Sequence, residues 1–290
     1  MQNNIIVRGI GGFYDVLTRD AKVIRCKLRG RLRLTMDRVL VGDWVEVTPL
    51  NDEEGVIEEI LPRKNELVRP AIANVDQAVV VLACSDPKPD WLFLDRLLVL
   101  IEANGLEPVI CFNKSDLIDE IEGYLDIIEI YRAAGYPVVI TSAAAGEGIE
   151  ELRTLLKDRV STFAGPSGVG KSSLLNKIES GLELAVGAIS AKLRRGKHTT
   201  RQVELIQLSF GGLVADTPGF SQLSLTGIKP QELQQYFPEF YEASFDCKFR
   251  GCMHVKEPDC AVTELVNSGK ISKLRYQNYL TLLEEIEQMR

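Results

Sequence analysis

The chain has 290 residues, of which 45% are hydrophobic, so it is long enough for two or three domains with buried cores. Its apolar runs are strand-sized, and its N-terminus lacks the charged head and apolar body of a signal peptide, which argues against a membrane or secreted protein. The net charge of −7 argues against a protein that coats nucleic acid indiscriminately. We therefore expect a cytoplasmic protein with no membrane partner.

The charge is distributed unevenly along the chain. Residues 1–48 contain nine Lys or Arg and five Asp or Glu, a balance of +4 that leaves −11 for the rest of the chain. A locally basic module on an acidic protein suits docking to a specific polyanion. A basic face that is simply solvated explains the same charge equally well.

Residues 1–68 are predicted to form a small β-barrel. Short strand-like segments follow one another with turn signals between them, for example 12–17, 22–29, 43–47 and 55–60. Between Arg25 and Leu34 basic and apolar residues alternate, which places the charges on one face, as an RNA-binding barrel needs. The pattern favours an OB-fold, although an SH3-like barrel would have much the same sequence.

Strand-like and helical patterns alternate over residues 69–224. Helical patterns such as 91–104 and 118–134 separate strand-like runs that end at Ala83, Asn113, Ser142, Gly165 and Asp216. This alternation is typical of an α/β domain with a mostly parallel sheet covered on both faces. Ligands bind such sheets at the carboxyl ends of the strands, and the polar motifs of this chain fall at those ends.

The segment Asn113-Lys-Ser-Asp116 has the residues of a guanine-reading loop. The Asp116 carboxylate can accept hydrogen bonds from both the N1–H and the 2-amino group of guanine, which adenine does not offer in that arrangement. We expect Asn113 to brace the loop and the Lys114 stem to cover the purine ring. One strand further along, Ser142 and Ala143 predict a companion loop with a backbone N–H that contacts guanine O6.

The segment Gly165-Pro-Ser-Gly-Val-Gly-Lys-Ser172 fits the phosphate-loop pattern and lies between a predicted strand and a predicted helix. Its glycines let successive backbone N–H groups point at phosphate oxygens, and the helix N-terminus adds a favourable dipole. Lys171 is expected to reach the β- and γ-phosphates and Ser172 to ligate magnesium. The predicted nucleotide contacts of this loop are Gly165, Pro166, Ser167, Gly168, Val169, Gly170, Lys171, Ser172 and Ser173.

The segment Asp216-Thr-Pro-Gly219 follows a further strand and predicts a switch that senses the γ-phosphate. Asp216 is expected to hold magnesium, usually through water, and the Gly219 N–H to contact the γ-phosphate. The next residue is Phe220, where Ras-like GTPases carry the glutamine that orients the attacking water. A phenyl ring cannot do that work, so another group must.

The basic stretch 194–201 predicts the other switch. Either Thr199 or Thr200 would complete the magnesium shell, and we take Thr200 together with Ser172 and Asp216 as the magnesium set. His198 is the candidate for orienting the water that Phe220 cannot hold. The alternative makes His198 an RNA contact. The basic neighbours in this stretch suit either RNA binding or a solvated loop; they are Arg194, Arg195, Lys197 and Arg201.

These motifs form one site only if their order is rotated. Ordinary GTPases place the phosphate loop first and the base reader last, whereas here the base reader comes first. Joining nearby termini and cutting the chain elsewhere preserves the sheet, so we expect a circularly permuted P-loop domain. Asp216–Gly219 then leads almost directly into the C-terminal part of the chain.

Residues 225–290 are predicted to form an α-helical zinc-binding domain. Helical spacing is found over 230–240 and 271–289. Four protein ligands leave no open position on a tetrahedral ion, so we expect one structural Zn²⁺ per chain, with a reduced cluster without metal as the alternative. The predicted ligands are Cys247, Cys252, His254 and Cys260.

Two further segments complete a specific resemblance, Arg69-Pro-Ala-Ile-Ala-Asn-Val-Asp-Gln77 and Gly196-Lys-His-Thr-Thr200. With the barrel, the permuted order and the Cys/His cluster, the whole chain resembles the ribosome small-subunit-dependent GTPase A family, also called RsgA, YjeQ or YloQ. The resemblance implies a bacterial assembly factor that binds the 30S subunit and its 16S rRNA late in maturation. It also implies that the subunit stimulates GTP hydrolysis, that hydrolysis promotes release, and that the cluster holds zinc.

The sequence therefore predicts a monomeric GTP hydrolase that uses Mg²⁺ with GTP or GDP, with His198, Lys171, Thr199 and Thr200 in catalytic roles. Intrinsic turnover is expected to be slow because the water-orienting glutamine is missing. A nucleotide kinase or ATPase could use the same phosphate loop, but the base reader at 113–116 weighs against it. A second alternative is a nucleotide-gated RNA- or ribosome-binding module in which hydrolysis is incidental.

Overall fold

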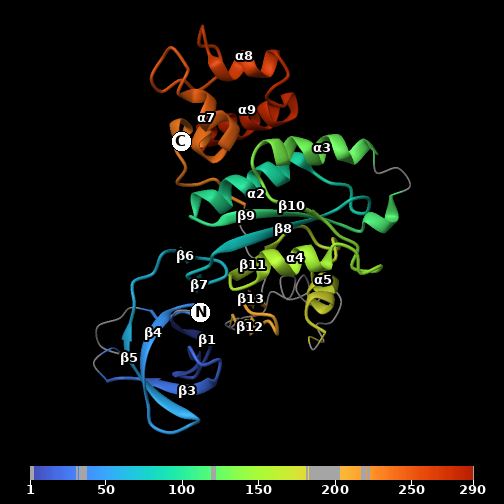
Figure 1. Cartoon of the computed structure of the whole chain (residues 1–290). Helices are drawn as coiled ribbons and strands as arrows, with labels where there is room; N and C mark the ends of the chain where they lie inside the picture. The colour runs from blue at the N-terminus through green and yellow to red at the C-terminus, as the bar shows by residue number, and fades with distance from the viewer. Residues whose placement is uncertain are drawn as a thin grey trace.

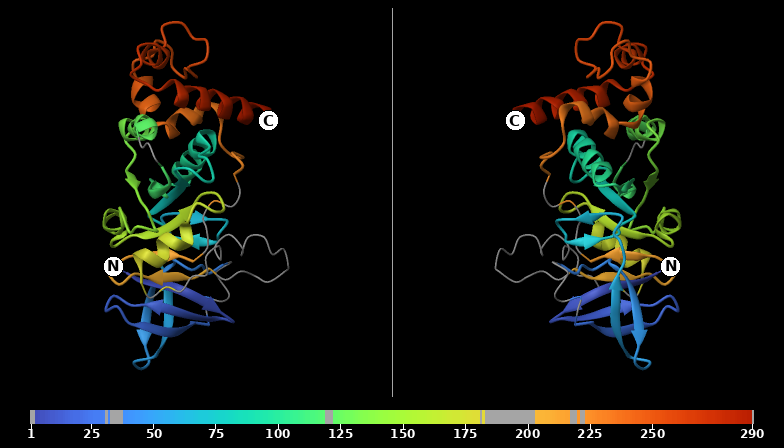
Figure 2. Two further views of the ribbon diagram at one scale, coloured as in Figure 1. Left: turned by 90° about the vertical axis from the view of Figure 1, so that its right-hand side faces the viewer. Right: turned by 90° about the vertical axis from the view of Figure 1, so that its left-hand side faces the viewer.

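The protein has three parts, a β-barrel, a six-stranded sheet between helices and a helical C-terminal domain (Figure 1). The side views in Figure 2 place the sheet domain between the other two. None of the described helices is both long and apolar enough to cross a membrane. The structure is a computed structural model that describes residues 3–30, 32, 38–118, 122–180, 182, 203–216, 220 and 223–289.

The N-terminal part is a closed barrel. Its strands are β1 (Asn4–Ile10), β2 (Phe13–Leu17), β3 (Val23–Leu28), β4 (Trp44–Pro49) and β5 (Glu54–Ile60). They follow the order β1-β2-β3-β5-β4, and every pair is antiparallel except β3 with β5. This is the strand order of an OB-fold, which confirms that prediction and excludes the SH3-like alternative.

Strand β3 shows the predicted alternation. Ile24 and Cys26 point into the barrel, where burial raises the pKa of the Cys26 thiol to about 11. Arg25 and Lys27 are exposed, and their charged groups lie 4.9 and 4.8 Å from the ring centroid of Phe13. Arg31, Arg33 and Leu34 of the alternation lie outside the described residues. Within β3, the outer face therefore combines two cations with an exposed aromatic ring.

A short ribbon of β6 (Glu66–Leu67) and β7 (Ile72–Ala73) joins the barrel to the sheet. The buried carboxylate of Asp43 accepts hydrogen bonds from Arg63 Nε at 2.6 Å and Nη2 at 2.9 Å. Gly42 has a φ of +90°, and a methyl group there would lie 2.0 Å from the Ala73 carbonyl oxygen. Only glycine permits this close approach between the barrel and the ribbon.

The middle part contains the sheet β10-β9-β8-β11-β13-β12. Its strands are β8 (Gln77–Ala83), β9 (Glu107–Asn113), β10 (Val138–Ile140), β11 (Val160–Ala164), β12 (Leu205–Gln207) and β13 (Leu213–Ala215). All neighbouring pairs are parallel except β12 with β13. The predicted strand ends were correct to within two residues, and the mostly parallel sheet is confirmed.

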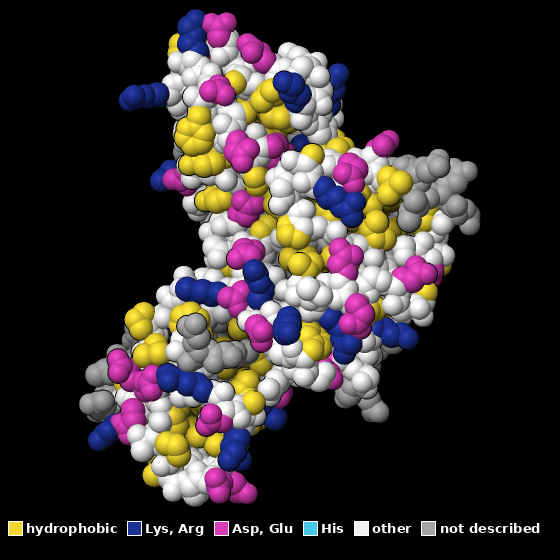
Figure 3. All heavy atoms as spheres, viewed as in Figure 1, with side chains coloured by type: hydrophobic (Ala, Val, Ile, Leu, Met, Phe, Trp, Pro, Cys, Tyr) yellow, Lys and Arg dark blue, Asp and Glu magenta, His cyan; other side chains and the backbone are white. Residues whose placement is uncertain are grey.

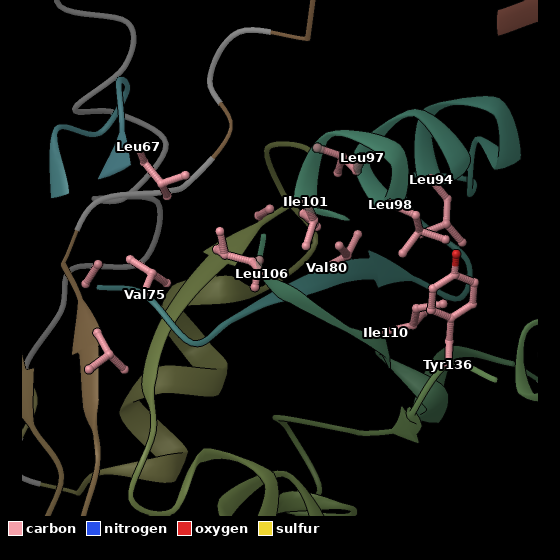
Figure 4. Close-up of a cluster of buried hydrophobic side chains, with 14 of the residues drawn as sticks. Leu67, Val75, Val80, Leu94, Leu97, Leu98, Ile101, Leu106, Ile110 and Tyr136 are labelled. Atoms are coloured by element: carbon pink, nitrogen blue, oxygen red, sulfur yellow. The ribbon is translucent and has the colours of Figure 1, made fainter. Parts of the chain in front are cut away.

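Helices cover both faces of the sheet. One face carries α2 (Trp91–Ala103) and α3 (Glu122–Ala133), and the other carries α4 (Ile149–Leu156) and α5 (Lys171–Ile178). Strand β8 is buried on both sides, because Val80 packs with the first pair of helices and Val79 with the second. Figure 4 shows Leu94, Leu98 and Ile101 of α2 directed towards the strands. Double burial explains the continuous apolar run of β8.

The C-terminal part is helical, as predicted. Its elements are the 3₁₀ helix η2 (Pro230–Tyr236) and the helices α7 (Pro238–Ser244), α8 (Ala261–Asn267) and α9 (Lys273–Gln288). The single helix expected over 230–240 is wrong, because two elements meet there. Pro238 lacks the N–H that would continue the first one and opens α7 instead.

The buried face of α9 differs from the predicted stripe. Leu283 and Ile286 are buried as expected, but Leu274 and Leu280 are only partly buried. The buried face of α9 also includes a charged residue, since the Arg275 side chain is 1% exposed. Spacing of apolar residues alone could not reveal a buried arginine.

Charges of both signs are interspersed over the face drawn in Figure 3. The positive balance of residues 1–48 therefore forms no continuous basic patch on that face. Large exposed aromatic side chains gather instead on the C-terminal domain, where Tyr241, Phe245 and Phe249 are all exposed.

Candidate nucleotide and metal sites

The predicted nucleotide motifs lie together at the carboxyl edge of the sheet. The base reader follows β9, the companion loop follows β10 and the phosphate loop follows β11. These strands are parallel to one another through β8, so their carboxyl ends meet at one edge.

Asn113 ties the three loops to one another. Its side chain is 1% exposed, and Nδ2 donates to the Val169 carbonyl of the phosphate loop at 2.8 Å. Its Oδ1 accepts from the Ala143 N–H at 3.2 Å and from the Thr141 hydroxyl at 3.1 Å. One buried amide thus fixes the base reader, the companion loop and the phosphate loop relative to one another.

The Asp116 carboxylate is held in place and remains exposed. The buried Ser142 hydroxyl donates to Asp116 Oδ1 at 2.5 Å and accepts the Ala145 N–H at 3.0 Å. The residue is exposed to solvent, so its carboxylate is accessible. A fixed, accessible carboxylate is what recognition of two adjacent N–H donors requires.

Lys114 has a left-handed backbone, with φ of 63°, and its ammonium reaches across the edge of the sheet. Nζ donates to the carbonyl oxygen of Asp86 at 2.5 Å. The neighbouring Pro87 lies beside the phosphate loop, because a methyl group on Gly168 would be 3.9 Å from its Cδ atom. The loop between β8 and α2 therefore contacts the base reader through Asp86 and runs close to the phosphate loop at Pro87.

Close packing against a backbone carbonyl and a side-chain amide explains two glycines of the phosphate loop. A methyl group on Gly165 would lie 2.1 Å from the Val81 carbonyl oxygen, and one on Gly170 would lie 2.3 Å from Asn113 Nδ2. Both residues also have positive φ angles, +129° and +97°. Larger residues at either position would push the loop away from the sheet.

Lys171 begins α5 and is folded back into the loop. Its Nζ donates to the carbonyl oxygens of Gly165 at 2.8 Å and Pro166 at 2.6 Å. Burial lowers the pKa of Lys171 to about 8. Ser172 follows it and is 5% exposed. An ammonium held by two neutral carbonyl oxygens keeps its positive charge uncompensated by them, which suits capture of an anion.

Asp216 lies directly after β13. Its Oδ1 accepts the Glu204 N–H at 2.9 Å, and its own N–H donates to the Glu204 carbonyl at 2.9 Å. Phe220 is partly buried against both the α2 side of the sheet and the C-terminal core, so its ring lies in an apolar environment. His198, Thr199, Thr200 and Gly219 lie outside the described residues, as do Arg194, Arg195, Lys197 and Arg201.

The four predicted metal ligands come together in the C-terminal domain. The ligand atoms of Cys247, Cys252, His254 and Cys260 all lie within 4.8 Å of one another, so the cluster could hold a metal ion. The other ring nitrogen of the histidine, Nε2, lies 2.7 Å from Gln234 Oε1 and can donate to it. This contact leaves Nδ1 as the ligand atom. Burial lowers the pKa of His254, which favours the neutral form that binds metals.

Two sequence-family models match this chain. The sequence model described as RsgA GTPase matches residues 60–226, and the one described as RsgA N-terminal domain matches residues 4–57. The chain belongs to the RsgA GTPase family. A curated relative, "Small ribosomal subunit biogenesis GTPase RsgA" of Caldanaerobacter subterraneus subsp. tengcongensis, is 53% identical over 98% of this chain and 95% of its own length. The protein of the same name from Moorella thermoacetica is 50% identical over 97% of this chain and 96% of its own length.

Solved structures extend the similarity to the whole RsgA-family fold. YjeQ from Thermotoga maritima is 43% identical with a TM-score of 0.88, over 99% of each chain. YloQ, described as a circularly permuted GTPase, is 42% identical with a TM-score of 0.87, over 99% of this chain and 96% of its own. The permuted order that the motifs predicted is thereby confirmed. The domain limits 1–68, 69–224 and 225–290 stay a prediction.

Several supporting residues of this RsgA-family chain were missed by the sequence interpretation. Asp86 acts through its backbone carbonyl and Gln234 through one side-chain contact, and neither belongs to a recognisable motif. The Ser142 hydroxyl was overlooked because the companion loop was expected to act through backbone N–H groups. Glu204 likewise contacts Asp216 through its backbone N–H and carbonyl groups. Such residues are found through geometry, since backbone groups leave no side-chain signature.

Proposed function

We propose that this RsgA-family chain binds GTP and GDP at the carboxyl edge of its sheet and hydrolyses GTP to GDP and phosphate. We further propose that it acts in the cytoplasm on the 30S subunit, late in maturation, and that the subunit stimulates hydrolysis. The proposal rests on the three hydrogen bonds of the Asn113 side chain, which join three nucleotide motifs into one site. The names of the curated relatives support the small subunit as the partner.

The base is selected by the Asp116 carboxylate, which Ser142 orients. It would accept the N1–H and 2-amino hydrogen bonds of guanine, while the N–H near Ala143 would donate to O6. The Lys114 stem would lie over the purine. Adenine would leave the carboxylate unpaired, and that penalty supports GTP over ATP.

The phosphates are bound by the backbone N–H groups of residues 165–173 and by Lys171. The ammonium would exchange the carbonyl oxygens of Gly165 and Pro166 for β- and γ-phosphate oxygens. Ser172, Thr200 and Asp216 offer oxygen ligands, which is the donor chemistry that Mg²⁺ prefers. When bound, the ion would neutralise charge on the phosphate oxygens.

Hydrolysis requires a polar group that orients water for in-line attack. Phe220 cannot supply one, and its ring packs against apolar cores. We assign this role to His198, on the same predicted switch as Thr199 and Thr200, when the subunit is bound. The positioning groups are Lys171, the switch threonines and the backbone N–H groups of the phosphate loop.

The C-terminal cluster holds one structural Zn²⁺. Three thiolates and one imidazole match the donor set of closed tetrahedral zinc sites. The contact between His254 and Gln234 orients the ring for the metal, which supports the assignment.

The barrel contacts 16S rRNA, and the chain acts as a monomer. The pair of cations over the exposed Phe13 ring supports RNA contact, since bases stack on aromatic side chains near positive charge.

Nucleotide competition and turnover test the proposal together. GTP and GDP should displace a fluorescent guanine nucleotide far better than ATP, and Asp116→Asn should shift preference towards xanthine nucleotides. Turnover should rise strongly when purified 30S subunits are added. Equal competition by ATP would refute the assignment of Asp116 as the residue that selects guanine. Subunit binding that depends on GTP without any rise in turnover would instead support the nucleotide-gated module.

A further inference from the structure

Arg275 is a fully buried charge that the proposed nucleotide chemistry does not use. Its guanidinium pairs with Asp95 at 2.5 Å and with both oxygens of Glu239 at 2.8 and 3.0 Å. Its side chain is 1% exposed and that of Asp95 is 0% exposed. The guanidinium carbon also lies 4.5 Å from the ring centroid of Phe237 and 5.3 Å from that of Tyr136. Neither partner of the ion pair can leave the other without stranding a buried charge.

The ion pair joins two domains. Arg275 lies on α9 of the C-terminal domain, whereas Asp95 lies near the start of α2 in the nucleotide domain. Asn278 of α9 donates to the second oxygen of Asp95 at 2.6 Å. Val99 and Leu100 of α2 are buried in the C-terminal core. Figures 1 and 2 show α2 lying between the sheet and that domain, so α2 is fixed to it along much of its length.

The beginning of the same helix contacts the nucleotide edge. Asp90 caps α2, and the ring of Trp91 packs edge-on against Phe112, at a centroid distance of 6.2 Å. Phe112 directly precedes the base-reader residue Asn113. The loop before the helix gives its Asp86 carbonyl to Lys114, and Pro87 lies beside Gly168. The start of α2 therefore contacts the strand end, and the loop before it contacts the base reader and runs close to the phosphate loop.

We propose that α2 transmits the position of the C-terminal domain to the guanine site, and that the Arg275–Asp95 clamp sets the rate of nucleotide release. This regulation rests on the proposed function. A displacement of the C-terminal domain carries Asp95 with it, because the buried pair stays together. The start of α2 then withdraws the Asp86 carbonyl from Lys114, and the lysine stem loses its support over the purine. A partner that engages the C-terminal domain thereby controls how long GDP remains bound.

Dissociation of a fluorescent GDP from the full-length, zinc-loaded protein measures this coupling directly. Arg275→Met removes the clamp and should raise the dissociation rate on the order of fivefold, as expected for residues that couple two sites without touching the ligand. Asp95→Asn keeps the size of the side chain and should act in the same direction if Arg275→Met does not fold. Arg132→Met is the matched control, since its partner Glu129 lies on the same exposed helix face.

A double variant separates transmission from general loosening. Lys114→Met removes the contact at the nucleotide end, so adding Arg275→Met should raise the rate no further. A folded Arg275→Met protein with a lower melting temperature but the wild-type GDP dissociation rate would overturn the proposal. Independent, multiplicative effects of the two substitutions would overturn it as well. Wild-type protein that binds no guanine nucleotide would refute the proposed function instead.

Discussion

The barrel and the C-terminal domain lie at opposite ends of the molecule (Figure 1) and are joined to the sheet domain in different ways. The barrel has an interior core of its own, which contains Ile6, Val16, Ile24, Cys26, Val45 and Ile57. It meets the sheet through outward-facing Ile5, Val7 and Leu17 and through an Arg8–Glu204 pair in which both side chains are over 40% exposed. The C-terminal core instead incorporates two residues of α2 and is closed by the buried Arg275–Asp95 pair.

These two kinds of junction predict different consequences when the barrel or the C-terminal domain is removed. A unit with its own core keeps that core when it is detached, and removing the barrel uncovers the sheet residues that pack against Ile5, Val7 and Leu17. The C-terminal domain completes its core with Val99 and Leu100, so its loss would expose α2 and disturb the helix that starts at the nucleotide edge. We therefore expect the barrel to act as a docking module and the C-terminal domain to be part of the nucleotide-binding unit.

The largest expected effect is on stability, when one ion pair is broken at the junction of the sheet domain with the C-terminal domain and, for comparison, one at its junction with the barrel. Asp95→Ala strands the buried Arg275 and should lower the free energy of unfolding by about 3 kcal/mol. Glu204→Ala, at the exposed barrel junction, should lower it by about 1 kcal/mol or less. Urea denaturation followed by far-UV circular dichroism measures both. Equal losses would remove the distinction between the two junctions.

A substitution in the proposed catalytic machinery should affect turnover without breaking either interdomain contact. His198→Ala should still bind GTP and the 30S subunit but lose stimulated turnover on the order of a hundredfold, because the attacking water is no longer oriented. The variant should also stay on the subunit in its GTP state, since release awaits hydrolysis. Single-turnover hydrolysis at saturating 30S decides the matter. Weaker subunit binding with a normal saturated rate would make His198 an RNA contact.

Removing zinc should loosen the C-terminal domain around the metal site and leave the barrel and the nucleotide site unchanged. Elemental analysis should find about one zinc per chain, and chelation should speed amide hydrogen exchange around residues 247–260 on the order of tenfold or more. The barrel should be unaffected. Nucleotide affinity should stay nearly constant, because α9 remains clamped to Asp95. A freshly purified, reduced sample without metal would refute the zinc assignment.

A smaller effect is expected at the phosphate loop itself. Burial lowers the pKa of Lys171 to about 8 in the free protein, and phosphate binding should raise it again. Affinity for GDP should therefore be highest below pH 8 and fall as pH rises through that value, by up to about tenfold per pH unit. Binding above pH 8 should take up protons. Calorimetry in buffers of different ionisation enthalpy measures the uptake, and a pH-independent affinity between pH 7 and 9 would contradict it.

Periodicity and motifs predicted most of the fold and the candidate site. The alternation in β3, the strand ends and the Cys/His cluster all follow from local rules, in which one residue type at one spacing has one physical role. The supporting contacts could not be predicted in that way. Arg275 pairs with a residue 180 positions earlier in the chain, and Asp86 and Glu204 act through backbone groups that any residue carries. Long-range pairing and backbone contacts become visible only in three dimensions.

We propose a subunit-stimulated GTPase in which the barrel docks and the remaining chain binds and hydrolyses nucleotide. Its most direct test is GTP turnover by full-length protein and by a variant that lacks residues 1–60, each with and without purified 30S subunits. The full-length protein should be strongly stimulated. The truncated protein should keep its intrinsic turnover and GTP affinity but lose most of the stimulation, because it binds the subunit weakly. Undiminished stimulation of the truncated protein, or none in the full-length protein, would contradict the claim.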